Sequence, residues 1–142
     1  MDENSCLSLT PHHVGISIPD LEAAIAWYEN MLGFTVERRM EVAQIPARIA
    51  WLRRDDFRLE LFEVADAAAL PDDRRVPNRD LKTHGTKQLA FAVSDVDAVV
   101  AELKIRGADI AMQTRIHGEP MAFIRDNAGT LIELVQKSSF EK

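Results

Sequence analysis

The chain contains an internal repeat, and this feature constrains its fold more than any other in the sequence. The segment HHVGISIPDLEAAIAWYENMLGF, which starts at His12, has the same plan as KQLAFAVSDVDAVVAELKIRGAD, which starts at Lys87. Each copy opens with a short β-type run, passes an aspartate, continues with helical periodicity and ends on a glycine. Two copies of one plan within 142 residues predict a fold built from two similar modules.

The repeat also relates individual polar residues. Gln88 corresponds to His13 at an offset of 75 residues, and Glu133 corresponds to Glu60 at an offset of 73. Because the offset changes by only two residues over this span, the loops can absorb the difference. The sequence therefore pairs an imidazole with an amide, and one carboxylate with another, at equivalent places of the two modules.

Each copy predicts one amphipathic helix. The first helix is predicted between Asp20, as its N-cap, and Gly33, as the left-handed residue past its end. The second is predicted between Asp95, which shares the capping role with Ser94 as an alternative, and Gly107. In both segments the apolar residues recur at the i, i+3, i+4 and i+7 spacing of a half-buried helix.

Strand patterns complete the two modules. Eight strands are predicted, at 13–18, 35–42, 47–53, 57–63, 88–93, 109–113, 121–125 and 131–136. Each module is then a strand, a helix and three strands, which is an α+β plan of the form βαβββ. We expect one domain over residues 1–142, with module 1 at about 11–66, a polar linker at 67–86 and module 2 at about 87–137.

Alternation along the strands assigns the polar residues to one face. Val14 and Ile16 share a face that suits packing against a helix, so His13 is expected on the opposite face. By the same alternation Gln88 points away from the aliphatic residues of its strand. Glu60 and Glu133 likewise point away from the leucines and isoleucines beside them.

Carboxylates inside apolar strands need an explanation, because an unpaired charge is costly to bury. Either each glutamate is solvated on an exposed sheet face, or the two carboxylates, the imidazole and the amide share a partner. A divalent cation would neutralise both charges and accept oxygen and nitrogen ligands. We favour the cation for the four residues taken together.

Four motifs give the chain a family resemblance, and together they span residues 12 to 136. They are HHVGISIPDLEAAIAWYENMLGF, RLELFE, GTKQLAFAVSDVDAVVAELKIRGADI and FIRDNAGTLIELVQ. These motifs resemble the vicinal oxygen chelate superfamily, which includes glyoxalase I, extradiol dioxygenases, methylmalonyl-CoA epimerases, and fosfomycin- and bleomycin-resistance proteins. The resemblance implies a glyoxalase-like fold, in which the two modules form a curved mixed sheet around a central cleft, and a homodimer.

The resemblance also implies metal ligands from the first and fourth strands of each module. Those positions are occupied by His13, Glu60, Gln88 and Glu133. Gln88 departs from the commonest pattern, which has histidine there, and three roles stay open for it: metal ligand, hydrogen-bond partner of the substrate, or cap of the strand. The implied cofactor is one divalent ion, with zinc, nickel, manganese, magnesium and iron as the candidates.

This ligand set favours proton-transfer chemistry of the glyoxalase type, as an isomerase or lyase. Glu60 and Glu133 are the candidate catalytic bases, because a glutamate beside the metal can carry a proton between adjacent carbons. A ring-cleaving dioxygenase is an alternative, although the two-histidine iron site of that class lacks its second histidine here. A binding or resistance protein without chemistry is the other alternative.

Residues near the glutamates are candidates for substrate binding. Arg58 and Phe62 should lie on the same side of their strand as Glu60, and Met121 and Phe123 alternate on a neighbouring strand of the other module. An arginine in an apolar cleft suits a carboxylate or another anionic substrate. The arginines of this region are equally explained as surface partners of nearby aspartates.

The other histidines are expected outside the site. His12 should lie on the opposite strand face from His13 and have a structural role. His84, in the linker, could line the cleft but is expected to be solvated, and His117 is expected in an exposed turn.

Composition limits the class of partner. The formal charge of −6, with basic residues interleaved among acidic ones, argues against a nucleic-acid or membrane surface and favours a small-molecule substrate. Cys6 is the only cysteine, so no intrachain disulfide can form. The first residues carry no basic region or apolar stretch, and we expect a cytoplasmic location.

Overall fold

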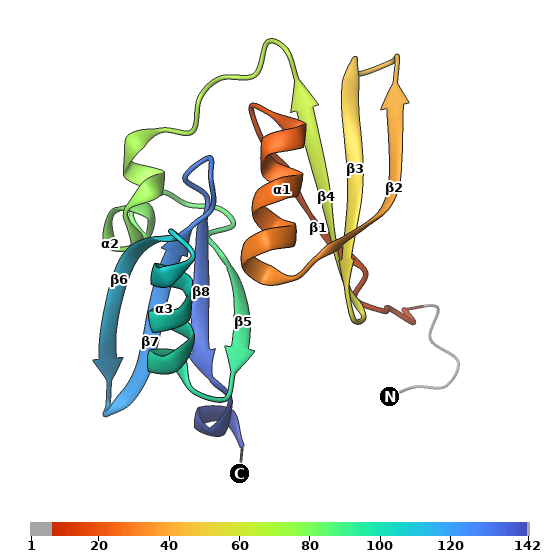
Figure 1. The fold of residues 1–142 in the computed structure, drawn as a ribbon. Helices are drawn as coiled ribbons and strands as arrows, with labels where there is room; N and C mark the ends of the chain where they lie inside the picture. Colours follow the sequence, from red (N-terminus) through yellow and green to blue (C-terminus); the bar gives the residue numbers. More distant parts are fainter. Residues whose placement is uncertain (1–6, 142) are drawn as a thin grey trace.

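The chain forms two modules of one plan in the computed structural model, which describes residues 7–141 (Figure 1). Cys6 lies outside these residues. Module 1 comprises β1 (His13–Ser17), α1 (Leu21–Leu32), β2 (Thr35–Val42), β3 (Ala47–Arg54) and β4 (Phe57–Val64). Module 2 comprises β5 (Leu89–Val93), α3 (Val96–Ile105), β6 (Asp109–Ile116), β7 (Glu119–Arg125) and β8 (Leu131–Gln136). The predicted α+β fold class, with two βαβββ modules, is confirmed.

Each module has its own four-stranded mixed sheet. The strand order is β1-β4-β3-β2 in module 1 and β5-β8-β7-β6 in module 2. The first and last strands of each module are parallel, and the other neighbours are antiparallel. Strands β1 and β5 are therefore edge strands, and each has one side that pairs with no strand of the described chain.

Both long helices begin and end where the capping residues predict. The side chain of Asp20 accepts a hydrogen bond from the backbone N–H of Ala23, and Asp95 does the same for Ala98, each at 3.0 Å. Gly33 has a φ of 71°, the left-handed conformation that terminates a helix at little cost only for glycine. The helices are thus fixed at both ends by local chemistry that is visible in the sequence.

The linker contains two short helical turns that periodicity could not predict. They are η1 (Asp72–Arg75) and α2 (Pro77–Asp80). A single turn is too short to show a repeating apolar pattern, so the sequence gives no periodic signal for it. None of the helices in residues 7–141 is long and apolar enough to span a bilayer.

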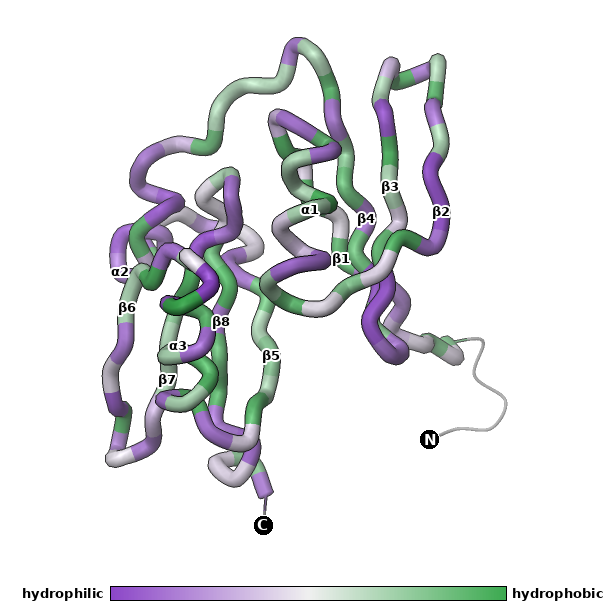
Figure 2. The backbone as a smooth tube through the Cα atoms, viewed as in Figure 1, coloured by the Kyte–Doolittle hydropathy of each residue, from purple (hydrophilic) through white to green (hydrophobic). Residues whose placement is uncertain are grey.

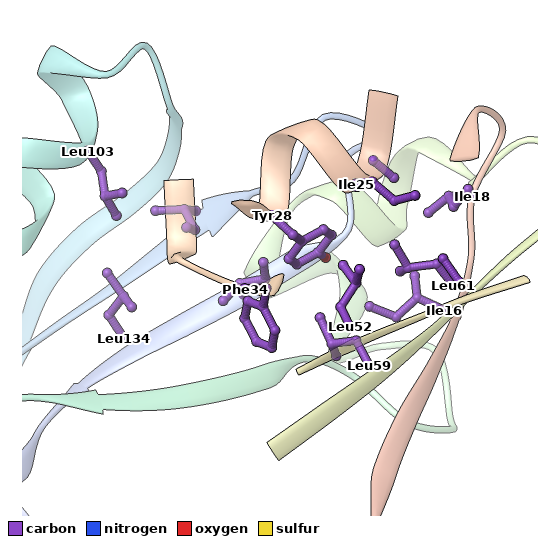
Figure 3. Close-up of a cluster of buried hydrophobic side chains, with 14 of the residues drawn as sticks. Ile16, Ile18, Ile25, Tyr28, Phe34, Leu52, Leu59, Leu61, Leu103 and Leu134 are labelled. Atoms are coloured by element: carbon purple, nitrogen blue, oxygen red, sulfur yellow. The ribbon is translucent and has the colours of Figure 1, made fainter. Parts of the chain in front are cut away.

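One hydrophobic core joins the two modules through the sheet faces that the helices cover. Figure 2 shows hydrophobic stretches along β4, β5 and β8 and hydrophilic ones around α2. The core includes Ile16, Leu59 and Leu61 from the helix side of the first sheet, and Ile132 and Leu134 from the helix side of the second. In the close-up, side chains of both modules lie in this cluster (Figure 3).

Tyr28 anchors the junction between the modules. Its side chain is fully buried, and its hydroxyl donates to Oδ2 of Asp126, in module 2, at 2.8 Å. The other oxygen of Asp126 accepts the backbone N–H groups of Ala128 and Thr130, both at 2.9 Å. Asp126 is only 4% exposed, and these three hydrogen bonds offset the cost of burying its carboxylate.

The burial pattern of β1 confirms the predicted register. Ile16 is buried in the core and Val14 packs against it, whereas His13 lies outside the core, with a third of its side chain exposed. The polar faces of both sheets consequently point away from the core that joins the modules. This arrangement decides where the candidate ligands lie.

We predict that Tyr28, the only tyrosine in the chain, ionises only when the chain unfolds. Burial, followed by the charge of Asp126, raises the pKa of the phenol well above its ordinary value. Because the folded pKa exceeds the unfolded value of about 10, the neutral phenol stabilises the fold fully below pH ~10, and this contribution is lost as the pH rises above it. Tyrosinate absorbance and circular dichroism should change together in an alkaline titration.

The variant Tyr28→Phe provides the second half of this test. It should lower the free energy of unfolding at neutral pH by about 1 to 2 kcal/mol, because a hydrogen bond to a carboxylate is lost. Its stability should then fall less steeply than the parent's above pH ~10. Tyrosinate that forms near pH 10 in a chain still folded by circular dichroism would refute the assignment.

Candidate metal centre

His13 and Glu60 form the first half of the candidate site, in module 1. Glu60 lies opposite Gly15 in the parallel pairing of β1 and β4, so its side chain emerges on the same face as His13. His13 Nε2 and Glu60 Oε1 are 3.5 Å apart. Two atoms that each bind an ion at 2.0–2.2 Å lie roughly 3 Å from one another, so this spacing suits a shared metal.

Aromatic rings border this pair. The Trp51 ring, on β3 opposite Glu60, packs edge-on against the His13 ring with centroids 4.5 Å apart. On the other side, a Cβ at Gly15 would lie only 3.1 Å from the ring of Phe62, so the absence of a side chain there lets the phenyl ring cover β1. Phe62 therefore lies on the predicted side of β4, beside the histidine and the carboxylate.

A groove of about 550 Å³ opens over the same face of the first sheet. It is lined by His12, Glu37, Arg38, Met40, Val42, Ile49, Trp51, Arg58 and Glu60. Arg58 is the predicted substrate contact in this set, and its guanidinium binds Glu37, with Nε 2.8 Å from Oε2. This hydrogen bond lowers the pKa of Glu37 below its usual range. The partner of Arg58 is thus a glutamate of β2 rather than one of the aspartates considered from sequence.

Gln88 and Glu133 form the second half, in module 2. Gln88 immediately precedes β5, and its side-chain amide donates to Oε2 of Glu133 at 2.8 Å. The other oxygen of Glu133 has no hydrogen-bond partner within residues 7–141. Phe123 stands opposite Glu133 in the pairing of β7 and β8, and Met121 lies two residues away on the same face. Both predicted hydrophobic contacts therefore share the face of this carboxylate.

A buried cluster in the linker fixes the chain just before Gln88. Asp80, which is 2% exposed, accepts hydrogen bonds from Arg74 and from Lys87, each at 3.1 Å. The ammonium of Lys87 also donates to the backbone carbonyl of Asp80 at 2.6 Å and to that of Thr83. Because Lys87 is the residue before Gln88, this cluster holds the start of β5 in place.

One chain does not bring the four predicted ligands together. In the part of the chain that the structure describes, no three His, Cys, Asp or Glu side chains approach closely enough to hold one ion. The two pairs lie on different sheets, and β4 and β5 run in opposite directions in Figure 1. Strand alternation predicted which face each side chain takes, but it carries no information on how the two modules pack.

The remaining histidines were predicted with mixed success. His12 was expected on the far face, and this is wrong: it lines the groove, and its Nδ1 is 2.8 Å from Nδ1 of His13. The reason is that His12 precedes the first residue of β1, so strand alternation does not extend to it. His84 and His117 are exposed, as predicted, and His117 occupies a turn with a φ of 51°.

Sequence reasoning missed Trp51 and Glu37. Trp51 was included in a predicted strand, and its position opposite Glu60 would have followed from pairing that strand with its neighbour. Glu37 lies at an irregularity in the pairing of β2 with β3, between Val36 and Arg38. A β-bulge of this kind leaves little trace in a single sequence, because it interrupts the alternation on which the prediction of strand faces depends.

Comparison with protein families agrees with this architecture. The family model described as the Glyoxalase/Bleomycin resistance protein/Dioxygenase superfamily matches residues 10–134. The chain belongs to this superfamily. The family resemblance noted in the sequence is therefore confirmed.

Two curated relatives show sequence identities of 28% to this chain. Mitochondrial methylmalonyl-CoA epimerase of Homo sapiens is 28% identical over 134 residues, covering 88% of this chain and 72% of the relative. Ethylmalonyl-CoA/methylmalonyl-CoA epimerase of Cereibacter sphaeroides is 28% identical over 131 residues, covering 88% of this chain and 96% of the relative.

Solved structures show the same fold. A glyoxalase family protein from Enterococcus faecalis superposes with a TM-score of 0.76 at 26% identity, covering 89% of this chain and 97% of that one. The trypanothione-dependent glyoxalase I of Leishmania major superposes with a TM-score of 0.70 at 25% identity, covering 93% of this chain and 89% of that one. The relatives thus include enzymes of the isomerase type and a glyoxalase.

We predict that Asp80→Asn lowers the free energy of unfolding by about 2 kcal/mol. The substitution removes the negative charge that pairs with the partly buried cationic groups of Arg74 and Lys87. Urea denaturation measures the change. Asp73→Asn is the matched control: that carboxylate is exposed, and within residues 7–141 it pairs only with the exposed Arg79, so its effect should stay within about 0.5 kcal/mol. Equal stabilities for Asp80→Asn and the parent would contradict an anchoring role for the cluster.

Proposed function

We propose that the protein is a divalent-metal-dependent enzyme of the isomerase or lyase type, which moves a proton at a carbon next to a carbonyl group of a small molecule. The observation that carries this proposal is the equivalence of Glu60 and Glu133. Each is a partly buried carboxylate on the open face of its sheet, and each has one side chain from the start of the neighbouring parallel strand beside it, an imidazole in module 1 and an amide in module 2. The names of the epimerase relatives support the same type of chemistry.

His13, Glu60, Gln88 and Glu133 would hold the ion. Each module contributes one carboxylate and one neutral donor, so the set would leave a divalent ion nearly neutral, with positions free for substrate oxygens. When bound, the ion would act as a Lewis acid that polarises those oxygens and acidifies the adjacent C–H. Gln88 would ligate through its oxygen or, in the hydrogen bond described above, orient the carboxylate of Glu133.

The complete site would then need two copies of the chain. The faces that carry the two ligand pairs point away from the core that joins the modules. The edge strands β1 and β5 present exposed small residues on those faces: Gly15 and Ser17, and Ala90 and Ala92. Free edges with small side chains allow another strand to approach closely. We therefore propose a homodimer in which module 1 of one copy faces module 2 of its partner.

In such a site the two glutamates would divide the proton transfer. One carboxylate would remove the proton from the substrate carbon, and the other would return a proton from the opposite side or to the neighbouring carbon. Trp51 and Phe62 flank the pair in module 1, and Phe123 and Met121 lie on the face of Glu133 in module 2. These side chains would exclude water from the exchanging proton and, with Arg58, contact the substrate.

The activity can be tested with two substrates in deuterated water. We expect the protein, loaded with a divalent ion, to exchange the α-proton of methylmalonyl-CoA for deuterium, as measured by proton NMR. The hemithioacetal of methylglyoxal and glutathione is the comparison, because its conversion to a thioester would assign a glyoxalase activity instead. Glu60→Gln and Glu133→Gln should each lower either activity by at least about a hundredfold. If neither substrate exchanges, the proton-transfer proposal fails for both classes.

The shared site predicts complementation between two inactive variants. Glu60→Ala and Glu133→Ala should each bind no ion when purified alone, as measured by elemental analysis of protein without a histidine tag. After dissociation and mixing in equal amounts, about a quarter of the parental metal content should return, because half of the dimers are mixed and one of their two sites is intact. No recovery on mixing would contradict a site shared between copies.

The same measurement assigns Gln88. Loss of the ion in Gln88→Ala would make the amide a ligand, and retention would make it a partner of Glu133 or of the substrate. A parent protein that binds no divalent ion even in excess would favour a metal-free binding protein.

A further inference from the structure

A β-bulge in the edge strand β2 places a cationic side chain over the groove. Thr35 and Val36 pair in sequence with β3, but the next paired residue is Arg38, opposite Trp51, so Glu37 is an extra residue on the β2 side. An extra residue of this kind redirects the side chains that follow it. Both Glu37 and Arg38 consequently line the groove, although neighbouring strand residues normally face opposite sides.

Arg38 stands in line with the candidate proton-transfer residue. It pairs with Trp51, which pairs in turn with Glu60, so the three residues form one row across β2, β3 and β4. Neighbouring strands lie about 4.8 Å apart, which puts the backbone at Arg38 roughly 10 Å from that at Glu60. Arg38 therefore lines the groove from the strand two places away from that of Glu60.

Two arginines line this groove, and Arg58 is paired with Glu37 whereas Arg38 has no ion-pair partner within residues 7–141. The carboxylate of Glu37 already pairs with the guanidinium groups of Arg58, at 2.8 Å, and Arg53, at 3.7 Å. The carboxylate of Glu60 lies beside His13. The Arg38 side chain forms no hydrogen bond or ion pair within residues 7–141.

Apolar side chains line the groove around the charge of Arg38. Met40, Val42 and Ile49 line the groove beside Arg38, and apolar walls strengthen its attraction for an anion. The next residue, Arg39, provides a contrast: it is also exposed, but its guanidinium forms two hydrogen bonds to Glu22.

We propose that Arg38 binds an anionic group, a carboxylate or a phosphate, on the part of the substrate remote from the reacting carbons. The inference rests on the proposed function, because Glu60 marks the reacting end of the groove. Both test substrates carry such groups on their thiol carriers: phosphates on coenzyme A and carboxylates on glutathione.

Binding of the carrier thiols to metal-free protein tests the proposal without requiring activity. The probes are coenzyme A, which carries phosphates; pantetheine, which is its neutral thiol arm; and glutathione, which carries carboxylates. Arg38→Gln should weaken the binding of at least one anionic probe roughly tenfold or more, because a charge-assisted hydrogen bond is lost. Its affinity for pantetheine should equal the parent's. Isothermal titration calorimetry at low salt measures these constants.

Arg39→Gln is the matched control, since it removes the same charge one residue away from a side chain that is paired with Glu22. It should bind every probe like the parent. Weaker binding of coenzyme A alone in Arg38→Gln would identify a phosphate, and weaker binding of glutathione alone a carboxylate. The proposal is overturned if Arg38→Gln binds both anionic probes like the parent, if Arg39→Gln loses as much affinity, or if the parent binds neither anionic probe.

Metal content separates this proposal from the proposed function. Arg38 is not among the candidate ligands, so Arg38→Gln should retain the parental amount of divalent ion. A parent that binds no ion but loses anion affinity in Arg38→Gln would refute the metal-dependent enzyme and leave the anion site standing. The reverse result is a parent that binds the ion and exchanges substrate protons, together with an Arg38→Gln variant that exchanges them equally fast at subsaturating substrate. That result would refute the anion site and leave the enzyme standing.

Discussion

The packing of the two modules through their helix-covered faces determines the position of every polar side chain in the candidate site. The buried hydrogen bond from Tyr28 to Asp126 lies at this junction, and the aromatic rings of Phe34, Phe57 and Phe91 contact one another beside it. Because the aliphatic faces meet in this core, the opposite faces of both sheets turn outward. The pair of His13 with Glu60, and that of Gln88 with Glu133, are thereby separated in one chain.

This separation gives a physical meaning to the repeat. Each module carries half of the candidate ligand set on its first and last strands, and in each half one side chain lies beside the carboxylate: an imidazole lies 3.5 Å from Glu60, and an amide donates to Glu133 at 2.8 Å. A half-site with one carboxylate can remain at the surface without an ion, since neither charge is deeply buried. Bringing the two carboxylates together would introduce repulsion that a cation removes. Metal binding and association of two copies are therefore expected to be coupled.

Local chemistry was predictable from the sequence, and packing between modules was not. The caps at Asp20 and Asp95, the strand faces and the outward orientation of His13 all follow from interactions within a few residues or from alternation along one strand. The position of His12 and the groove-facing Glu37 were missed because both depend on where strand pairing begins or is interrupted. The distance between the two ligand pairs depends on a core assembled from residues far apart in the chain, which no local pattern specifies.

Sedimentation equilibrium of the tag-free protein, over a dilution series with and without a divalent ion, tests the coupling between metal and assembly most directly. The shared site predicts that the ion shifts the monomer–dimer equilibrium toward the dimer, with one ion bound per chain at saturation, because a ligand stabilises the form that binds it. A monomer that binds one ion tightly, with no change in its association, would contradict the account and place a complete site within a single chain.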